Sequence, residues 1–386
     1  MKRGSVKILS LILCLAFAFP LSVAAQPPQQ EQNTGAELPC NAAILMDAKT
    51  GTVLFEQNAD QALPPASVTK IMTLLLVMEA IKSQRISLRD DVTVSANAAS
   101  MGGSQVYLKE GECMSVEEML KCVVIASAND CAVALAEFVA GSEEEFVAAM
   151  NKRAAELGMK NTHFENTNGL DDTVTAHLTS ARDIAIMSRE LIRYPKILEY
   201  SGIWMDSIRD GSFGLTNTNR LVRFYPGCTG LKTGSTSRAG FCISATAERG
   251  GVSLICVIMG ADTRDVRNQT AAKLLDFGFA NFSTYCGEAG KQSVRVTGGV
   301  SPTVNVSWQG AAVTVPKGQE ASVVCEVELA EALAAPIERG ARVGVVRYLL
   351  DGKEIAASDI VAEESVEKIE FSTLFWRLLC RFLLVG

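Results

Sequence analysis

The 386-residue chain contains only two histidines, His163 and His177, and none of its eleven cysteines form a C-x-x-C pair. Neither histidine has the spacing of a metal ligand, so we expect no metal site and no cofactor. The chain also lacks an excess of positive charge, since its net charge is −7 and its pI is near 5.2. Nucleic-acid binding usually needs a basic face, so this balance argues against that class of function.

Apolar residues, in contrast, make up 48% of the chain, which is enough for one large core and a smaller second domain. The N-terminus has the three parts of an export signal: positive charges, an apolar run and small residues, at Lys2, Arg3 and Lys7, residues 8–19 and residues 23–25. We therefore predict a signal peptide over 1–25 and an extracytoplasmic protein. An uncleaved membrane anchor is the alternative, because residues 8–25 nearly reach the length of a bilayer span. Export permits disulfides, but the spacing of the ten cysteines after residue 25 reveals no pairing.

The rest of the chain divides into segments that differ in residue composition and hydrophobic pattern. Residues 26–36 are rich in Gln and Pro and predict a linker. Alternating strand patterns and apolar helix patterns follow over 37–285, and we expect a domain that contains both strands and helices. Strands are expected at 240–247 and 252–259, and a closing helix at 271–282. Short alternating segments over 290–362 predict a small β-sandwich domain.

The tail, residues 365–386, has the pattern of an amphipathic helix. One side is apolar, through Phe371, Leu374, Phe375, Leu378, Leu379, Phe382 and Leu383. Thr373, Arg377 and Arg381 fall on the other side. Cations opposite an apolar stripe predict a helix that lies in the membrane plane and anchors the protein peripherally, and the two arginines argue against a spanning segment. Packing of this helix against the protein's own second domain is the alternative.

Ser67 and Lys70 form the most informative motif, Ser-x-x-Lys, at the start of a long apolar run. A helix beginning near Ser67 places residues i and i+3 on one face, so the hydroxyl and the amine can meet. A lysine whose pKa is lowered by burial can take the proton of the serine. The pair therefore predicts a serine nucleophile that works without histidine.

Two later motifs give this pair its context. Ser127-Ala128-Asn129 falls between two predicted apolar helices, and Lys232-Thr233-Gly234 lies on or just before the first strand of the later pair. Each motif also has a second match in a less suitable setting: Ser365 to Lys368 near the C-terminus, Ser95 to Asn97 in a polar stretch, and Lys49 to Gly51 in a hairpin turn.

The ordered set Ser67-x-x-Lys70, Ser127-x-Asn129 and Lys232-Thr233-Gly234 resembles the motifs of the penicillin-recognising serine enzymes. The closer resemblance is to the D-alanyl-D-alanine carboxypeptidases, the low-molecular-weight penicillin-binding proteins of the S11 peptidase type. It extends over about 40–285 and is carried further by Pro65 to Thr73, Asn129-Asp130, Asn168 to Leu170, Ser180 to Asp183, Gly230 to Gly234 and Ala239 to Cys242. It implies an α+β fold: a penicillin-binding transpeptidase and β-lactamase-like domain, with an antiparallel sheet flanked by helices, followed by the β-rich domain and the tail helix.

The same resemblance implies the chemistry. Ser67 would attack the bond between the last two D-alanines of a peptidoglycan stem pentapeptide, and β-lactams would trap the resulting acyl-enzyme. Lys70 would accept the proton of Ser67, and Ser127 would relay a proton to the departing D-alanine. Asn129 would hydrogen-bond the peptide, and Lys232 would supply positive potential.

The resemblance also implies how the substrate would be held. Thr233 of the Lys232-Thr233-Gly234 motif would bind the terminal carboxylate, and the backbone N–H groups of Ser67 and Ser235 would form the oxyanion hole. Arg267 corresponds to a carboxylate-binding arginine of the family. Arg264 is its rival for that role, and a surface salt bridge is the alternative for Arg267.

Three other functions remain as alternatives. A β-lactamase would share the three motifs but needs an added base, and Glu165 lacks the expected Asn four residues later, where Gly169 stands. A catalytically idle muropeptide or β-lactam sensor would use the same fold without turnover. Endopeptidase action on cross-links is the third.

Overall fold

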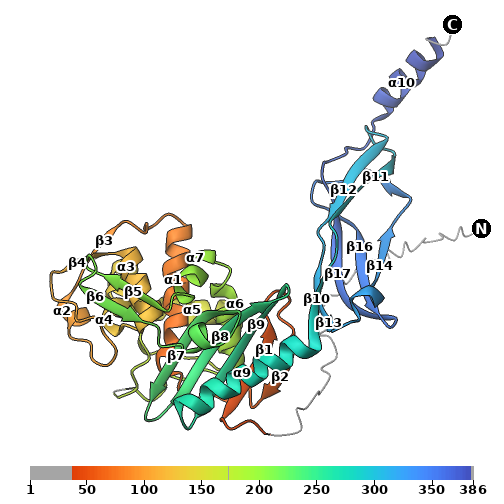
Figure 1. Cartoon of the computed structure of the whole chain (residues 1–386). Helices are drawn as coiled ribbons and strands as arrows, with labels where there is room; N and C mark the ends of the chain where they lie inside the picture. The colour runs from red at the N-terminus through yellow and green to blue at the C-terminus, as the bar shows by residue number, and fades with distance from the viewer. Residues whose placement is uncertain (1–36, 173, 384–386) are drawn as a thin grey trace, which may run out of the picture. The chain divides into compact units, whose positions relative to one another are not determined.

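The computed structural model describes residues 37–172 and 174–383, so the predicted signal peptide and linker lie outside the described residues. A five-stranded antiparallel sheet with strand order β2-β1-β9-β8-β7 organises the first part of the chain (Figure 1). Its strands are β1 Ala42–Asp47, β2 Val53–Gln57, β7 Cys228–Thr236, β8 Gly240–Arg249 and β9 Val252–Ala261.

Both faces of this sheet are buried, as the sequence of β1 illustrates. Ala42, Ile44 and Met46 belong to one apolar cluster, and Ala43 and Leu45 belong to the cluster on the opposite face. Successive side chains of a strand point to opposite faces, so an unbroken apolar strand requires cover on both sides.

The helix α9, Arg264–Asn281, covers one face and buries Leu274 and Leu275 there. The other face is covered by a larger helical layer. Its members are η1 Ala66–Thr69, α1 Lys70–Lys82, α2 Ala96–Ala99, α3 Val116–Lys121, the π-helical turn η2 Cys122–Ala126, α4 Asn129–Ala140, α5 Glu143–Glu156, α6 Ala181–Leu191 and α7 Pro195–Ser201.

Three smaller elements complete this part: the hairpins β3 Asp91–Thr93 with β4 Cys113–Ser115 and β5 Met205–Ile208 with β6 Phe213–Thr216, and the short helix α8 Leu221–Phe224. Cys122, Cys131, Cys242 and Cys256 are buried, and the ten cysteines within the described residues are free thiols.

A second, β-rich part follows. It contains a two-stranded sheet of β10 Phe282–Cys286 and β13 Ala312–Pro316, and a six-stranded sheet in the order β14-β16-β17-β12-β11-β15. The remaining bounds are β11 Gly290–Thr297, β12 Thr303–Trp308, η3 Glu320–Ser322, β14 Val324–Leu329, β15 Ala332–Ala334, β16 Arg342–Leu350 and β17 Lys353–Ala362. Its own apolar cluster includes Val304, Val346 and Ile360, so this part has a core separate from the first.

The terminal helix α10, Phe371–Leu383 within the described residues, begins later than the 365–386 segment that the sequence indicated. Residues before it are extended, and Val366 pairs with Ile337 and is buried in the β-rich core. The apolar side chains of α10 are exposed, at 81% for Phe371 and 82% for Phe382. Across residues 37–172 and 174–383, no helix has both the length and the apolar character that crossing a membrane would require.

The predicted α+β class with an antiparallel sheet, a β-rich segment and a terminal helix is confirmed. Two details differ. Lys232 lies in the middle of β7, a strand of its own that pairs with β8, rather than at the start of β8. The helix expected at 271–282 begins seven residues earlier, because Thr263 caps it by accepting a hydrogen bond from the Val266 N–H.

Candidate active site

Ser67 lies in the single 3₁₀ turn η1, immediately before the first residue of α1, Lys70. This tight turn brings the Lys70 Nζ to 2.8 Å from the Ser67 Oγ. The apolar residues that follow Lys70 anchor α1 in the core, with Ile71, Met72 and Leu75 fully buried. The packing of the helix therefore fixes the position of the amine against the hydroxyl.

Lys70 is fully buried, and burial lowers the pKa of its amine well below 10.5. The positive charge of Lys232 lowers the pKa further, while Asp130 acts against the shift. Besides Ser67, the Nζ contacts two oxygens that can only accept: Asn129 Oδ1 and the Asn168 carbonyl, each at 2.6 Å. In its neutral form the amine has two N–H groups and one lone pair. When the two accepting oxygens take both N–H groups, the lone pair is left for the Ser67 hydroxyl.

Ser127 follows the π-helical turn η2 and has a left-handed backbone, with φ of 65°. Lys232 of β7 donates from Nζ to the Ser127 Oγ at 2.8 Å and to the Thr233 carbonyl at 2.8 Å. Burial lowers the pKa of Lys232 to about 7, and Arg267 contributes to this shift. Two buried lysines with lowered pKa values thus hold one serine each.

Asn129 links Lys70 to the loop residues 102–104. Its Oδ1 accepts from Lys70, its Nδ2 donates to the Gly102 carbonyl at 2.7 Å, and its backbone N–H donates to the Ser104 carbonyl at 2.7 Å. The resemblance predicts that Asn129 hydrogen-bonds the peptide, and this stays a prediction. In the structure its side chain contacts the Lys70 amine and the Gly102 carbonyl.

The middle of β7 packs directly on the turn that carries Ser67. A Cβ at Gly234 would lie 2.8 Å from the Ser67 backbone nitrogen and 2.9 Å from the Pro65 carbonyl oxygen, so only glycine allows this approach. Thr233 donates from Oγ1 to the Thr218 Oγ1 at 2.8 Å. Ser235 is the next residue of β7 after Gly234.

Arg267 and Arg264 are now distinguished by burial. Arg267 is 2% exposed, and its Nη1 donates to the Cys242 carbonyl at 3.3 Å, whereas Arg264 is exposed at the start of α9. Burial lowers the pKa of Arg267 to about 10, with the charge of Arg264 next in importance. Its five N–H groups include contacts to Asn268 and Cys242 but no carboxylate among the described residues.

The second matches to the motifs lie in other settings. Ser365 to Lys368 is extended rather than helical, so its serine and lysine do not share a helix face. Ser95 caps α2 and donates to Glu137 at 2.6 Å, and Lys49 lies in the β1–β2 turn, where its amine donates to the Gly251 carbonyl. The structure brings together the set at 67, 127 and 232.

Three contributors were not assigned a role by the sequence: Asn168, Thr218 and His177. Asn168 acts through its backbone carbonyl, which every residue type has, so the sequence could not indicate this contact. Thr218 has no motif around it, and its contact with Thr233 depends on the fold. His177 lacks the spacing of a metal ligand in the sequence, and its contact with Thr69, 108 positions away, likewise depends on the fold.

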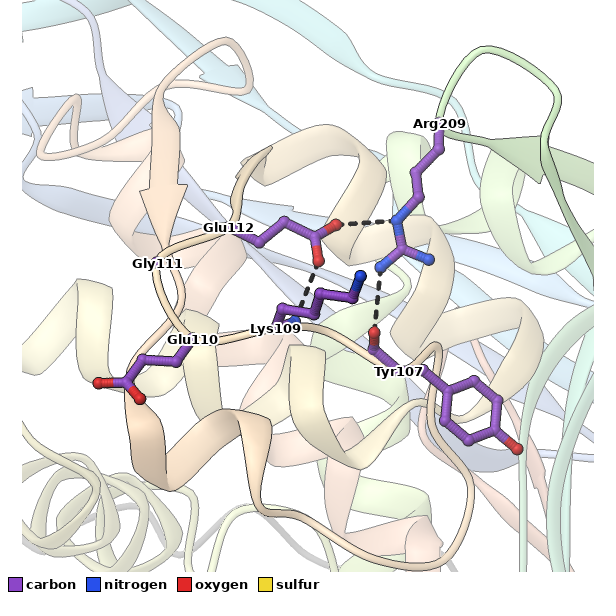
Figure 2. Close-up of a pocket in the computed structure, with 6 residues that line it drawn as sticks. All are labelled: Tyr107, Lys109, Glu110, Gly111, Glu112 and Arg209. Carbon is purple, nitrogen blue, oxygen red and sulfur yellow. Dashed lines mark hydrogen bonds and ion pairs between the residues drawn. The ribbon is translucent and has the colours of Figure 1, made fainter.

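A surface hollow of about 530 Å³ lies apart from these residues, between the 107–112 loop and the β5–β6 hairpin (Figure 2). Arg209 reaches across it and donates to Glu112 Oε1 at 2.8 Å and to the Val106 carbonyl at 2.9 Å. In the same loop, the backbone N–H of Leu108 donates to the buried Asp130 carboxylate at 3.1 Å. Arg209 therefore fixes a loop that packs against the residue following Asn129.

Comparisons with known proteins agree with this geometry. The family model "D-alanyl-D-alanine carboxypeptidase", Peptidase S11, matches residues 26–263, and the model "Penicillin-binding protein 5, C-terminal domain" matches residues 286–368. The carboxypeptidase DacF of Bacillus subtilis is 41% identical over 385 residues, covering 98% of each chain. DacA of Escherichia coli is 33% identical over 384 residues, covering 94% of this chain and 92% of that protein.

Solved structures give the same result. Penicillin-binding protein 5 from Haemophilus influenzae superposes with a TM-score of 0.78 at 34% identity, covering 87% of this chain and 100% of that one. The fold and activity that the motifs predicted are thereby confirmed. The chain belongs to the peptidase S11 family of serine-type D-alanyl-D-alanine carboxypeptidases.

Proposed function

We propose that Ser67 is the nucleophile of this carboxypeptidase and that Lys70 is its general base. The observation that carries the proposal is the placement of the Lys70 amine, 2.8 Å from the Ser67 Oγ and 2.6 Å from two oxygens, of Asn129 and Asn168, that can only accept. In its neutral form this amine donates to those two oxygens and accepts the serine proton as the bond to the substrate carbonyl carbon forms.

The remaining groups follow the course of the reaction. The Ser67 Oγ bonds to the carbonyl carbon of the penultimate D-alanine, and the backbone N–H groups of Ser67 and Ser235 receive the negative oxygen. The proton taken by Lys70 returns through the Ser127 hydroxyl to the departing nitrogen as the C–N bond breaks. Water then hydrolyses the ester, with Lys70 accepting its proton and Ser67 regenerated.

Recognition of the C-terminal end of the substrate is assigned to Lys232, Thr233 and Arg267. A peptide that ends in a carboxylate needs a fixed cation and hydroxyl donors at that end. The buried Arg267 is preferred over Arg264, because a guanidinium shielded from water and not neutralised by a carboxylate gains more from an incoming anion.

Brief exposure to benzylpenicillin followed by intact-mass analysis tests this assignment. We expect a single penicilloyl adduct, and peptide mapping should place it on Ser67. The untreated protein should release D-alanine from a stem pentapeptide that ends in D-Ala-D-Ala. An adduct on another residue, or rapid hydrolysis of penicillin without a lasting adduct, would contradict the proposal.

We further propose an exported, peripherally membrane-attached enzyme: a signal peptide over 1–25, a linker over 26–36, a peptidase domain over 37–285, a β-rich domain over 290–362 and an anchor near the C-terminus. The exposed aromatic and aliphatic side chains of α10 support the anchor, because an amphipathic helix with such a face binds the boundary between lipid headgroups and acyl chains.

Deletion of residues 371–386 is expected to release the protein from anionic phospholipid vesicles in a flotation assay and to leave D-alanine release unchanged. The cut is placed after Glu370 because Val366 is part of the β-rich core and its loss would destabilise that domain. Replacement of Arg377 by Gln in the full-length chain is a smaller change than the deletion. This variant should bind anionic vesicles more weakly than the wild type but more strongly than the truncated protein. If the truncated protein still floats with lipid, α10 is not the anchor.

A further inference from the structure

His177 is a buried histidine that the catalytic scheme above does not use. Its side chain is 1% exposed and packs edge-on against Phe164, with ring centroids 5.7 Å apart. Its Nε2 lies 2.7 Å from the Thr69 Oγ1, and its Nδ1 accepts the backbone N–H of Glu165 at 2.9 Å. The ring therefore joins the nucleophile turn to the segment that carries Asn168.

The direction of these hydrogen bonds is determined. A backbone N–H can only donate, so the Nδ1 of His177 has no proton and the neutral ring carries its proton on Nε2. The Nε2–H donates to Thr69, and the Thr69 hydroxyl donates in turn to the Ala66 carbonyl at 2.8 Å. The result is a chain of three hydrogen bonds, all in one direction, from Glu165 to Ala66.

The end of this chain matters because of what the Ala66 carbonyl is attached to. The peptide that joins Ala66 and Ser67 is trans and planar, so its C=O and N–H point in opposite directions. A hydrogen bond that holds the Ala66 carbonyl therefore also sets the direction of the Ser67 N–H. That N–H is one of the two donors assigned above to the oxyanion hole.

The backbone at this peptide needs to be held. Ala66 has φ of 49°, a left-handed conformation that is uncommon for a residue other than glycine and persists where the surroundings impose it. The segment after Glu165 presses on the same carbonyl, since a Cβ at Gly169 would lie 1.9 Å from the Ala66 oxygen. The Thr69 hydroxyl and the Gly169 backbone thus confine the Ala66 carbonyl together.

We propose that His177 is a positioning residue for acylation, which orients the Ala66–Ser67 peptide through Thr69 so that the Ser67 N–H faces the developing oxyanion. The inference rests on the proposed role of Ser67 as nucleophile. It concerns the transition state rather than substrate binding, because the oxyanion forms only when the serine has attacked.

The surroundings keep this ring neutral. Burial lowers the pKa of His177 to about 4, and the charged and titratable groups that face it are Glu165, His163, Asp171 and Arg238. If the ring took a second proton, on Nδ1, that N–H would face the Glu165 backbone N–H, and two donors cannot hydrogen-bond to each other. The chain of hydrogen bonds is therefore intact throughout the neutral pH range.

Two substitutions separate the two hydrogen bonds of the ring. His177→Asn keeps an oxygen near the position of Nδ1, which accepts from Glu165, but has no donor that reaches Thr69. His177→Gln keeps an N–H near the position of Nε2 and loses the acceptor. We expect His177→Asn to lower the rate constant of acylation by benzylpenicillin about 10- to 100-fold, somewhat less than the loss of a whole oxyanion donor.

The dissociation constant of the initial non-covalent penicillin complex should stay within about twofold in the same variant, because the oxyanion is absent at that stage. His177→Gln should retain most of the acylation rate. Phenylboronic acid, whose tetrahedral adduct on a serine places an oxygen in the oxyanion hole, should bind His177→Asn more weakly by a similar factor to the loss in acylation. Thr69→Val removes the same relay at its other end and serves as the second variant if His177→Asn does not fold.

The control is His163→Asn. His163 is exposed and lies on the segment that carries Glu165, and this variant should be acylated at the wild-type rate. Equal losses in the Asn and Gln variants that follow a lowered Tm would show a purely structural role and overturn the proposal, as would a wild-type acylation rate in both His177→Asn and Thr69→Val. Ser67→Ala distinguishes this failure from that of the underlying assignment. Retained labelling in Ser67→Ala refutes the nucleophile, whereas lost labelling there with full acylation in His177→Asn refutes the positioning role alone.

Discussion

Replacing Ser67 with alanine is expected to abolish covalent labelling by penicillin and to lower the kcat for D-alanine release by about 10⁴-fold or more. The reason is that the Lys70 lone pair would then face a methyl group, and no other serine in the described part of the chain lies between that amine and the Gly234 backbone. The measurement is intact mass after penicillin exposure, together with a coupled assay for free D-alanine.

The matched control for this substitution is Ser365→Ala, which removes the serine of the second Ser-x-x-Lys match. That serine accepts a hydrogen bond from the Arg339 backbone at 2.9 Å in the β-rich domain, so its loss should leave labelling and activity unchanged. Labelling that survives in Ser67→Ala would show that another residue is acylated.

Lys70→Arg should have the second largest effect, lowering the rate constant of acylation by about 10²- to 10⁴-fold, the range expected for loss of a general base. A guanidinium remains protonated at every accessible pH, so it cannot accept the serine proton. Stopped-flow acylation with a chromogenic cephalosporin measures this rate constant. Lys82→Arg, at the other end of α1, is the matched control and should acylate normally.

The wild-type enzyme should show the corresponding pH dependence. Because the pKa of Lys70 is lowered, kcat/KM should rise with pH as this amine loses its proton, at pH values well below 10.5. It should fall again above about pH 7 as Lys232 loses its proton and its charge. The absence of the rising limb in the wild-type profile would contradict the assignment of Lys70 as the base.

The sequence predicted the contact between Ser67 and Lys70 correctly because their relationship is local. A spacing of three residues in a helical turn fixes the distance between Ser67 and Lys70 almost independently of the rest of the fold. The position of Lys232 was less accurate. Its small and polar neighbours Thr233 and Gly234 do not have the apolar alternation that predicts a strand. The strand β7 forms because β8 pairs with it and because Gly234 allows a close approach to Ser67.

The supporting groups were beyond the reach of the sequence for a different reason. Asn168 contributes a main-chain oxygen, and any residue type could supply it. The link between His177 and Thr69 spans 108 positions, and nothing at either end specifies the other. Similarly, the helix that carries Arg267 begins early because of a capping threonine, so the arginine is brought into the protein interior rather than left on a loop.

The contacts of the Lys70 amine also bear on how the enzyme matures. Its oxygen partners lie 59 and 98 positions further along the chain, on different segments, and Lys232 comes later still. A nascent or partially folded polypeptide therefore has a serine and an ordinary charged lysine, which do not react with β-lactams. Labelling by fluorescent penicillin would consequently begin only when the last of these segments has folded against Lys70, and its rate would measure the refolding kinetics.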